Sequence, residues 1–550
     1  MVFLISVGVF LVTFLTGRAL AIIYFHFFNK NYSFSNFENN NLFLKYIYPI
    51  ISLFFIGNLS IFFNFFLPLK TVRTYFFILV FLLIFINIFT LPTREFFFNY
   101  FKIMFPVNLL LAVSTYGQNV HYDATVYKLQ YQSWLQQSKI VFGHVNFRDL
   151  FGYTGIMEYI SSLVWLNNNL VVVHILSVVM FTTFYVFIIA NSLDKKNQFL
   201  HYSSILLLIF SFLDNFGIGG GANGFLKFQM TGTYDLMFGI VFFFANIILI
   251  QNIIEKSYSS TNYFLISLLL LFSFQIRIFA VASIGLYLFY SYKLIQNTTF
   301  KIRHIFILNS ALYLIFIIYT LRNFIISGCL LLPVSFTCFD TFEWSSEISS
   351  LATRGLSYYN VYRPGSNIFI WMNEWISVPK NNQIFLNFIF SFSIIVVFSA
   401  IFFKKKKRST GIIVSVFNIF FIWIIFFLSG PTPRFGMGIF LISIVTIAVF
   451  VDDFKINFTN KHLQLFILTL SFLAVAATPR LYSYIELVDS NFENYSILLP
   501  EYDFKESENG WGLIPAVQKD LEKCGAVYNC FVNGVEQNIQ NKGTYFIFTK

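Results

Sequence analysis

Long, uninterrupted runs of apolar residues are the feature that most constrains this chain. Each run has about 20 residues with few charges, which is the length that an α-helix needs to cross the hydrocarbon core of a bilayer. Only helices and closed barrels satisfy their backbone hydrogen bonds within lipid, and runs without alternation argue against a barrel. The sequence therefore predicts an all-α, polytopic bundle of transmembrane helices.

We predict 13 spans, or 14 if the longest segment contains two helices. Segment 262–292 is too long for one straight crossing, and Arg277 near its middle predicts either two short helices that meet there or one strongly tilted helix. The predicted spans lie near 3–26, 47–66, 75–92, 98–116, 168–191, 199–216, 232–252, 262–292, 303–322, 382–403, 410–429, 433–451 and 462–480. The composition agrees, because charged residues make up only 11% of the chain, about half the share in an average soluble domain.

Basic residues predict the orientation, because short loops rich in Lys and Arg stay in the cytoplasm. The clearest marker is the run 404–408, and counting spans outward from it places the basic loops 193–198 and 293–304 on the same side. The long loops 117–167 and 323–381 then lie outside. We expect a multi-pass protein of the inner, cytoplasmic membrane. Two basic residues, Lys70 and Arg73, disagree with this count, because they fall in a predicted outer loop.

The predicted domains are a multi-pass membrane domain over 1–480 and a small extracytoplasmic C-terminal tail over 481–550. The tail has ten acidic residues, five lysines and no arginine. The four cysteines of the chain all lie on the predicted outer side, where disulfides persist. We predict two local bridges, because short loops close readily; the alternative is four unpaired, buried thiols. The predicted pairs are Cys329 with Cys338 and Cys524 with Cys530.

The formal charge of +11 does not call for nucleic acid. Outside the cytoplasmic loops, no basic stretch is interleaved with aromatic residues as in a nucleic-acid groove. Soluble enzyme classes find no support either, because no zinc-ligand spacing and no nucleophile elbow occur. The glycine-rich stretch 217–224 lacks the Gly-Lys-Ser/Thr ending of a phosphate loop and is interpreted as a flexible outer loop.

The first candidate for chemistry is Asp123, a few residues beyond the fourth predicted span. A carboxylate fixed at that level could act as a general base on an acceptor hydroxyl. The residues that follow, among them Val126, Leu129 and Trp134, are compatible with an amphipathic helix along the membrane interface. The alternative interpretation of Asp123 is a solvated loop aspartate.

Three arginines are candidates for binding a phosphate, because the planar guanidinium can donate two hydrogen bonds at once. Arg322 and Arg434 lie at outer ends of predicted spans, against the positive-inside trend. Arg277 lies within a predicted membrane segment, where a charge is by default functional or paired. The alternative for the two outer arginines is snorkelling to lipid head groups or pairing with an acidic neighbour.

A family resemblance rests on four short motifs in a fixed order. These are Tyr122-Asp123-x-x-x-Tyr127-x-Leu129-Gln130, Gly143-x-x-Asn146, Arg322-Asn323-x-x-x-Ser327-Gly328 and Pro433-Arg434-Phe435-Gly436. Together they span residues 120 to 436 and resemble a group of bacterial multi-pass proteins associated with surface-polysaccharide synthesis. That group in turn resembles the GT-C glycosyltransferase superfamily.

The resemblance implies transfer of a sugar from a polyprenyl-phosphate donor on the outer membrane face. It gives Asp123 the acid/base or acceptor-positioning role, and it makes Tyr122, Tyr127 and Arg434 candidates for binding the substrate. Two positions depart from the pattern. Lys128 stands where the group usually has His, which puts a substrate contact there in doubt, and Cys329-Leu330 replaces a typical Tyr-Pro.

We therefore expect a GT-C-type membrane glycosyltransferase whose partners are membrane lipid, a polyprenyl-phosphate-linked sugar and a glycan or lipid acceptor. The sequence demands no cofactor, although a divalent metal is compatible with it. One alternative is a polymerase or ligase of lipid-linked glycans, which would suit the outer loop 323–381 with Arg354 and Arg363. The other is a polysaccharide transporter or flippase, for which pseudo-repeated halves are expected.

Overall fold

The computed structural model describes most of the N-terminal two-thirds of the chain and parts of the remainder. The described residues are 1–28, 38, 43–89, 94–116, 118–165, 169–213, 230–297, 302–332, 334–346, 367–379, 381–382, 385–386, 389, 410–429, 433–453, 497–506, 513–517, 523–531, 539–542 and 545–549.

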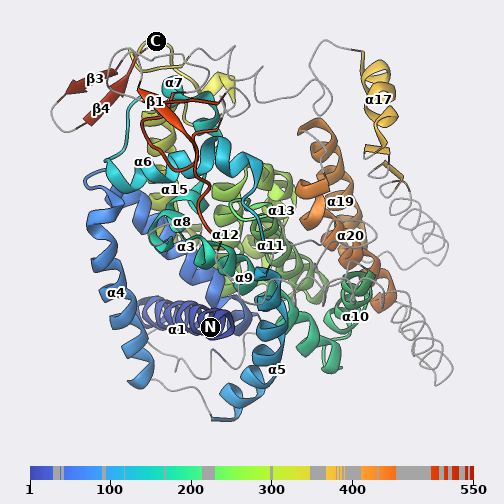
Figure 1. Ribbon diagram of the computed structural model, residues 1–550. Helices are drawn as coiled ribbons and strands as arrows, with labels where there is room; N and C mark the ends of the chain where they lie inside the picture. The colour runs from blue at the N-terminus through green and yellow to red at the C-terminus, as the bar shows by residue number, and fades with distance from the viewer. Residues whose placement is uncertain are drawn as a thin grey trace.

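The described chain is mostly helical, and seven of its helices are long and apolar enough to cross a membrane. The helices that contain these stretches are α1 (Val2–Phe28), α3 (Leu44–Asn64), α4 (Leu69–Phe89), α9 (Val171–Leu193), α11 (Asp235–Glu255), α13 (Ile284–Asn297) with the 3₁₀ turn η5 (Ile278–Ser283) before it, and α15 (Ser310–Ser327). Figure 1 shows them gathered into one bundle, in which α9 and α11 are almost entirely buried.

Other apolar helices complete the bundle. They are α5 (Arg94–Ala112), α10 (Gln198–Leu213), α12 (Ser260–Ile276), α14 (Ile302–Leu308), α19 (Thr410–Ser429) and α20 (Pro433–Asp453). Every predicted span therefore overlaps helix in the described residues except 382–403 and 462–480, which lie largely or wholly outside them. The predicted span 303–322 is divided at Asn309 between α14 and α15. A further helix, α17 (Ile368–Ser377), lies in the second outer loop.

The long predicted segment around Arg277 is two helices and not one tilted helix. Helix α12 ends at Ile276, Arg277 has extended backbone torsions, and η5 follows directly. A charged side chain at the break can leave the helix axis and find a partner, whereas a continuous helix would hold it against apolar neighbours. Arg277 is therefore presented at the junction of two half-helices.

The segment between α5 and α9, which the sequence predicts to be an outer loop, folds into a helical cap. Its elements are the 3₁₀ turn η1 (Val113–Thr115), the π-helix η2 (Ala124–Lys128), α6 (Leu129–Gln137), α7 (His144–Phe147), the 3₁₀ turn η3 (Asp149–Tyr153) and α8 (Ile156–Val164). Another 3₁₀ turn, η6 (Ser335–Thr337), belongs to the second outer loop.

The expectation of an interfacial, amphipathic helix after Asp123 is wrong. Val126, Leu129 and Trp134 are buried, and so are polar residues between them such as Gln130 and Gln132. A helix lying on the membrane surface would expose its polar face, whereas α6 is enclosed by protein on both faces.

Part of that enclosure comes from the C-terminal tail. Its described strands are β1 (Phe504–Glu506), β2 (Leu513–Pro515), β3 (Ile539–Lys542) and β4 (Tyr545–Phe548). They form two antiparallel hairpins, β1–β2 and β3–β4, which lie beside the cap at the top of Figure 1. Gln130 donates to the carbonyl of Cys530 over 2.7 Å, and the ring of Trp134 packs against Tyr528, Phe546 and Phe548. The described parts of the tail thus form one face of the cap.

Both predicted disulfides are confirmed. Cys329 is bonded to Cys338 beside the end of α15, and Cys524 is bonded to Cys530 in the tail. The second bridge holds the turn whose Gly525 N–H donates to the carbonyl of Thr125 over 2.9 Å. The tail therefore contacts the chain two residues from Asp123.

Membrane orientation gives a direct test of this arrangement. Reporter fusions after Asn146, Trp375 and Gln518 should report the outside, and a fusion after Lys407 should report the cytoplasm. The same side for the fusions at 146 and 407 would contradict the placement of the cap. Arg73, which opposed the count, donates to the carbonyl of Ser162 in α8 over 3.0 Å. That bond ties the start of α4 to the cap and gives Arg73 a structural role there.

Candidate functional site

Two segments far apart in the sequence meet at Asp123. The N–H of Thr231 donates to the carbonyl of Asn119, and the carbonyl of Thr231 accepts from the N–H of His121, both over 3.0 Å. These bonds connect the residues just before α11 with the residues just before η2. Gly232 has a φ of +94°, and a Cβ there would lie 2.4 Å from the Cβ of Ala124. Only glycine allows this close approach. The contact brings the start of α11 to the residue after Asp123.

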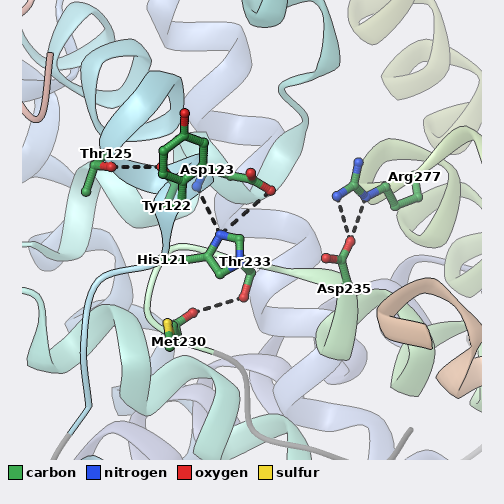
Figure 2. Close-up of polar contacts among 8 residues, drawn as sticks. All are labelled: His121, Tyr122, Asp123, Thr125, Met230, Thr233, Asp235 and Arg277. Carbon is green, nitrogen blue, oxygen red and sulfur yellow. Dashed lines mark hydrogen bonds and ion pairs between the residues drawn. The ribbon is translucent and has the colours of Figure 1, made fainter. Parts of the chain in front are cut away.

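His121 lies directly beneath Asp123. The N–H of Asp123 donates to Nδ1 of His121 over 3.0 Å, and Oδ2 of Asp123 lies 3.7 Å from the same nitrogen (Figure 2). Because Nδ1 accepts a hydrogen bond, the proton of the neutral ring is on Nε2. In this tautomer the ring orients the Asp123 backbone and does not neutralise the carboxylate.

Arg277 forms an ion pair with Asp235 at the start of α11. Nε and Nη2 of Arg277 both donate to Oδ1 of Asp235, over 2.9 and 2.6 Å. The Arg277 guanidinium also lies over the ring of Phe435 in α20, 4.9 Å from its centroid. Among the described residues, Nη1 of Arg277 has no hydrogen-bond partner. In Figure 2 the carboxylate of Asp123 points toward this guanidinium.

Lys128 is a buried cation at the centre of the cluster. Its side chain is 3% exposed, and Nζ lies 4.8 Å from the ring centroid of Tyr234 and 5.9 Å from that of Tyr127. Within the described part of the chain, no hydrogen bond satisfies its ammonium group. Burial lowers the pKa of Lys128, and the nearby carboxylate of Glu158 opposes that shift.

Glu158 supplies a second buried carboxylate. It is 3% exposed and accepts a hydrogen bond from the N–H of Gly155 over 2.7 Å, which caps the first turn of α8. Glu158 also interacts electrostatically with Tyr127, Lys128 and Arg277. We refer to Asp123, Tyr127, Lys128, Glu158, Asp235 and Arg277 as the outer polar cluster.

Exposure divides the cluster into two layers. The side chains of Asp123 and Arg277 are each 25% exposed, whereas Asp235 is 1% exposed and Tyr127 is 8% exposed. Tyr122, beside Asp123, is 53% exposed. The more exposed layer therefore presents a carboxylate, a guanidinium and a phenol, with a buried ammonium behind them. A base and donors for an anion are thus available together.

Arg322 lies elsewhere and is fully enclosed. Its Nε donates to Tyr159, its Nη1 to the carbonyl of Thr154 and to Asn323, and its Nη2 to Tyr131 and the Thr154 hydroxyl. A guanidinium has five N–H donors, and all five are used. The expected substrate contact of Arg322 therefore gives way to a structural role: it ties α15 to the cap.

The structure describes only the backbone of Arg434 and none of Arg354 and Arg363. Arg434 belongs to the first turn of α20, next to Phe435, but its side chain lies outside the described residues. Arg354 and Arg363 also lie outside them.

The Gly143-x-x-Asn146 motif joins three segments of the outer region. The side chain of Asn146 donates to the carbonyl of Trp344 over 3.0 Å and to that of Phe548 over 3.1 Å. Gly143 has a φ of +61° and lies against the same two residues. This motif therefore holds the cap, the second outer loop and the tail together, away from the cluster.

Sequence reasoning missed the roles of several cluster residues. Glu158 looks like an ordinary helix-capping residue, and Lys128 looked like a departure from a family pattern. Asp235 is the partner of Arg277. One signal was available: an intramembrane arginine calls for an acid, and Asp235 is the acidic residue next to the preceding predicted outer loop. In the described parts of the chain, no group of three acidic, His or Cys side chains could hold a metal ion.

The sequence matches the model of a family described as a domain of unknown function, DUF8201, over residues 1–441. The matched region includes the whole outer polar cluster and ends within α20. No curated protein and no solved structure matches the chain.

Proposed function

We propose that this chain, which belongs to the DUF8201 family, is a membrane glycosyltransferase of the GT-C type. It would move a sugar from a polyprenyl-phosphate carrier to an acceptor on the outer face of the cytoplasmic membrane. The observation that carries the proposal is that one cluster holds two partly exposed groups of opposite charge, the carboxylate of Asp123 and the guanidinium of Arg277. Such a pair can serve an acceptor hydroxyl and a departing phosphate together.

The chemical step needs little beyond these groups. Asp123 removes the proton from the acceptor hydroxyl as its oxygen attacks the anomeric carbon. The bond between that carbon and the carrier phosphate breaks, and the electron pair leaves with the phosphate. Arg277, through Nη1, and the Lys128 ammonium stabilise the added negative charge, which has greatest effect where water is excluded.

Lys128 gives the proposal a pH dependence. If its ammonium holds the phosphate, the KM for the donor should rise as the pH increases through the lowered pKa of Lys128, because the neutral amine cannot balance the phosphate. Lys128→Met should raise the donor KM about tenfold at neutral pH, the loss of one charge-assisted contact, and should remove this alkaline change. The measurement is donor KM against pH for both proteins. The same alkaline change in both would contradict the role of Lys128.

The same lowered pKa affects protein stability in the opposite direction: activity is expected to fall as the pH rises, whereas stability is expected to increase. An unfolded lysine holds its proton up to its ordinary pKa, so between the two pKa values the unfolded state binds more protons and the free energy of unfolding rises with pH. A loss of activity at high pH caused by unfolding can therefore be told apart from deprotonation of Lys128 in the folded protein.

The test of the function itself uses the donor that the cell makes. Cells lacking the gene should accumulate the unused lipid-linked sugar, which is extracted and reconstituted in liposomes with the purified full-length protein and an extract containing acceptors. We expect the protein to convert polyprenyl-phosphate sugar to polyprenyl phosphate, measured by mass spectrometry. Consumption only of diphosphate-linked oligosaccharides would assign a polymerase or ligase, and movement of the lipid between leaflets without cleavage would assign a flippase.

A further inference from the structure

A cavity of about 790 Å³ opens at the other end of the bundle. It lies between the start of α3, the middle of α5 and the end of α9. Helix α9 has 23 residues, which at 1.5 Å per residue separates its two ends by about 34 Å. The cap precedes the first residues of α9, whereas the cavity lies beside the last residues of that helix. The cavity is therefore distinct from the outer polar cluster.

Lysines dominate the charge of the cavity lining. Lys45, Lys102 and Lys196 contribute from three different parts of the chain, and Asp194 is the acidic residue of the lining. Asp194 interacts electrostatically with Lys45, and its Oδ1 accepts the N–H of Lys196 over 3.0 Å. With one carboxylate against three ammonium groups, the lining has an excess of two positive charges.

The rest of the lining is mostly apolar. Ile103 and Val107 of α5 face the same space as Val186 and Ile189 of α9. Pro106 also lines the cavity; it has no N–H to donate, which leaves the carbonyl of Lys102 without its usual helical donor. A free phosphate would use the lysines and leave this apolar wall exposed to water, whereas a phospholipid would use both.

The side of the membrane also favours a lipid. The cavity includes Lys196, from the basic loop 193–198 that the positive-inside pattern assigns to the cytoplasm. The cytoplasmic leaflet carries the anionic lipids, and basic pockets between transmembrane helices on this side suit their head groups.

We infer that this cavity binds the phosphate head group of an anionic phospholipid from the cytoplasmic leaflet. The lysines contact the phosphate, and the apolar wall between α5 and α9 contacts the upper part of an acyl chain. This site is independent of the proposed sugar transfer.

The test measures lipid retention by the purified full-length protein in detergent, using native mass spectrometry. The probes are phosphatidylglycerol, phosphatidylcholine and inorganic phosphate. The variant Lys102→Gln/Lys196→Gln changes two exposed residues of the lining, so folding should be unaffected. The matched control is Lys195→Gln, an exposed lysine adjacent to Lys196 that does not line the cavity.

We expect phosphatidylglycerol to be retained in preference to phosphatidylcholine and not to be displaced by an equal concentration of inorganic phosphate. The double variant should bind phosphatidylglycerol about 20- to 30-fold more weakly, since each lysine near an anionic head group contributes about fivefold. Lys195→Gln should change retention less than twofold. Equal retention of the two lipids, equal effects of the lining and control variants, or displacement by inorganic phosphate would each overturn the inference.

Discussion

Asp123→Asn is expected to lower the rate of sugar transfer by about 10²- to 10⁴-fold, the usual contribution of a positioned general base. The amide keeps the size and shape of the carboxylate and can still accept hydrogen bonds, but it cannot take the acceptor's proton. Abundance in the membrane should stay normal, because the side chain is 25% exposed and its backbone N–H still donates to His121. The measurement is initial rate at saturating donor, with protein amount determined in the same preparation.

The matched control for Asp123→Asn is Asp149→Asn. Asp149 is another partly exposed aspartate of the same cap, and its Oδ1 accepts the N–H of Leu150 over 2.8 Å, which an asparagine oxygen can also do. Its replacement should leave the rate within about twofold, as for an ordinary surface change. Equal effects of the two variants would mean that Asp123 acts only through the local fold.

Arg322→Met is expected to destabilise the protein by about 3–5 kcal/mol, because several buried neutral acceptors lose a donor at once and each unsatisfied buried group costs about 1–3 kcal/mol. All five N–H donors of Arg322 have buried acceptors, including the hydroxyls of Tyr131 and Tyr159. Methionine fills much of the volume but leaves these acceptors without a donor. The expected result is a lower unfolding temperature and lower membrane abundance, measured by size-exclusion chromatography after stepwise heating.

The control for Arg322→Met is Arg303→Met, the same change at an exposed position of α14. It should shift the unfolding free energy by less than about 0.5 kcal/mol. If Arg322→Met instead kept normal thermal stability and raised the donor KM, Arg322 would bind substrate as the sequence predicted.

The helices could be predicted from the sequence because an apolar run of membrane length is a local property. The break at Arg277 was one of two predictions for its segment, since a charge in the middle of such a run calls either for a break or for a strong tilt of the helix. Both disulfides were predictable for a similar reason, because each closes a short loop, with its two cysteines close together in the sequence.

The site was less predictable because its contacts join distant segments. Arg277 and Asp235 are 42 residues apart, and the sequence around either residue does not identify the other as its partner. Trp134 suggested a membrane surface because large aromatic residues are common there, but rings from the distant C-terminal tail, Tyr528, Phe546 and Phe548, pack against it. Arg322 is the converse case. Its position in the sequence suggested that it binds a phosphate, and only the fold shows that all its N–H donors bond to other residues of the chain.

The most direct measurement compares wild type and Asp123→Asn in release of polyprenyl phosphate from the extracted lipid-linked sugar, at equal amounts of folded, purified protein. We predict rapid release by the wild type and a rate at least about 100-fold lower for the variant. Equal release by both proteins would remove Asp123 from the mechanism, and no release by the wild type in the presence of acceptor would contradict the proposed sugar transfer itself.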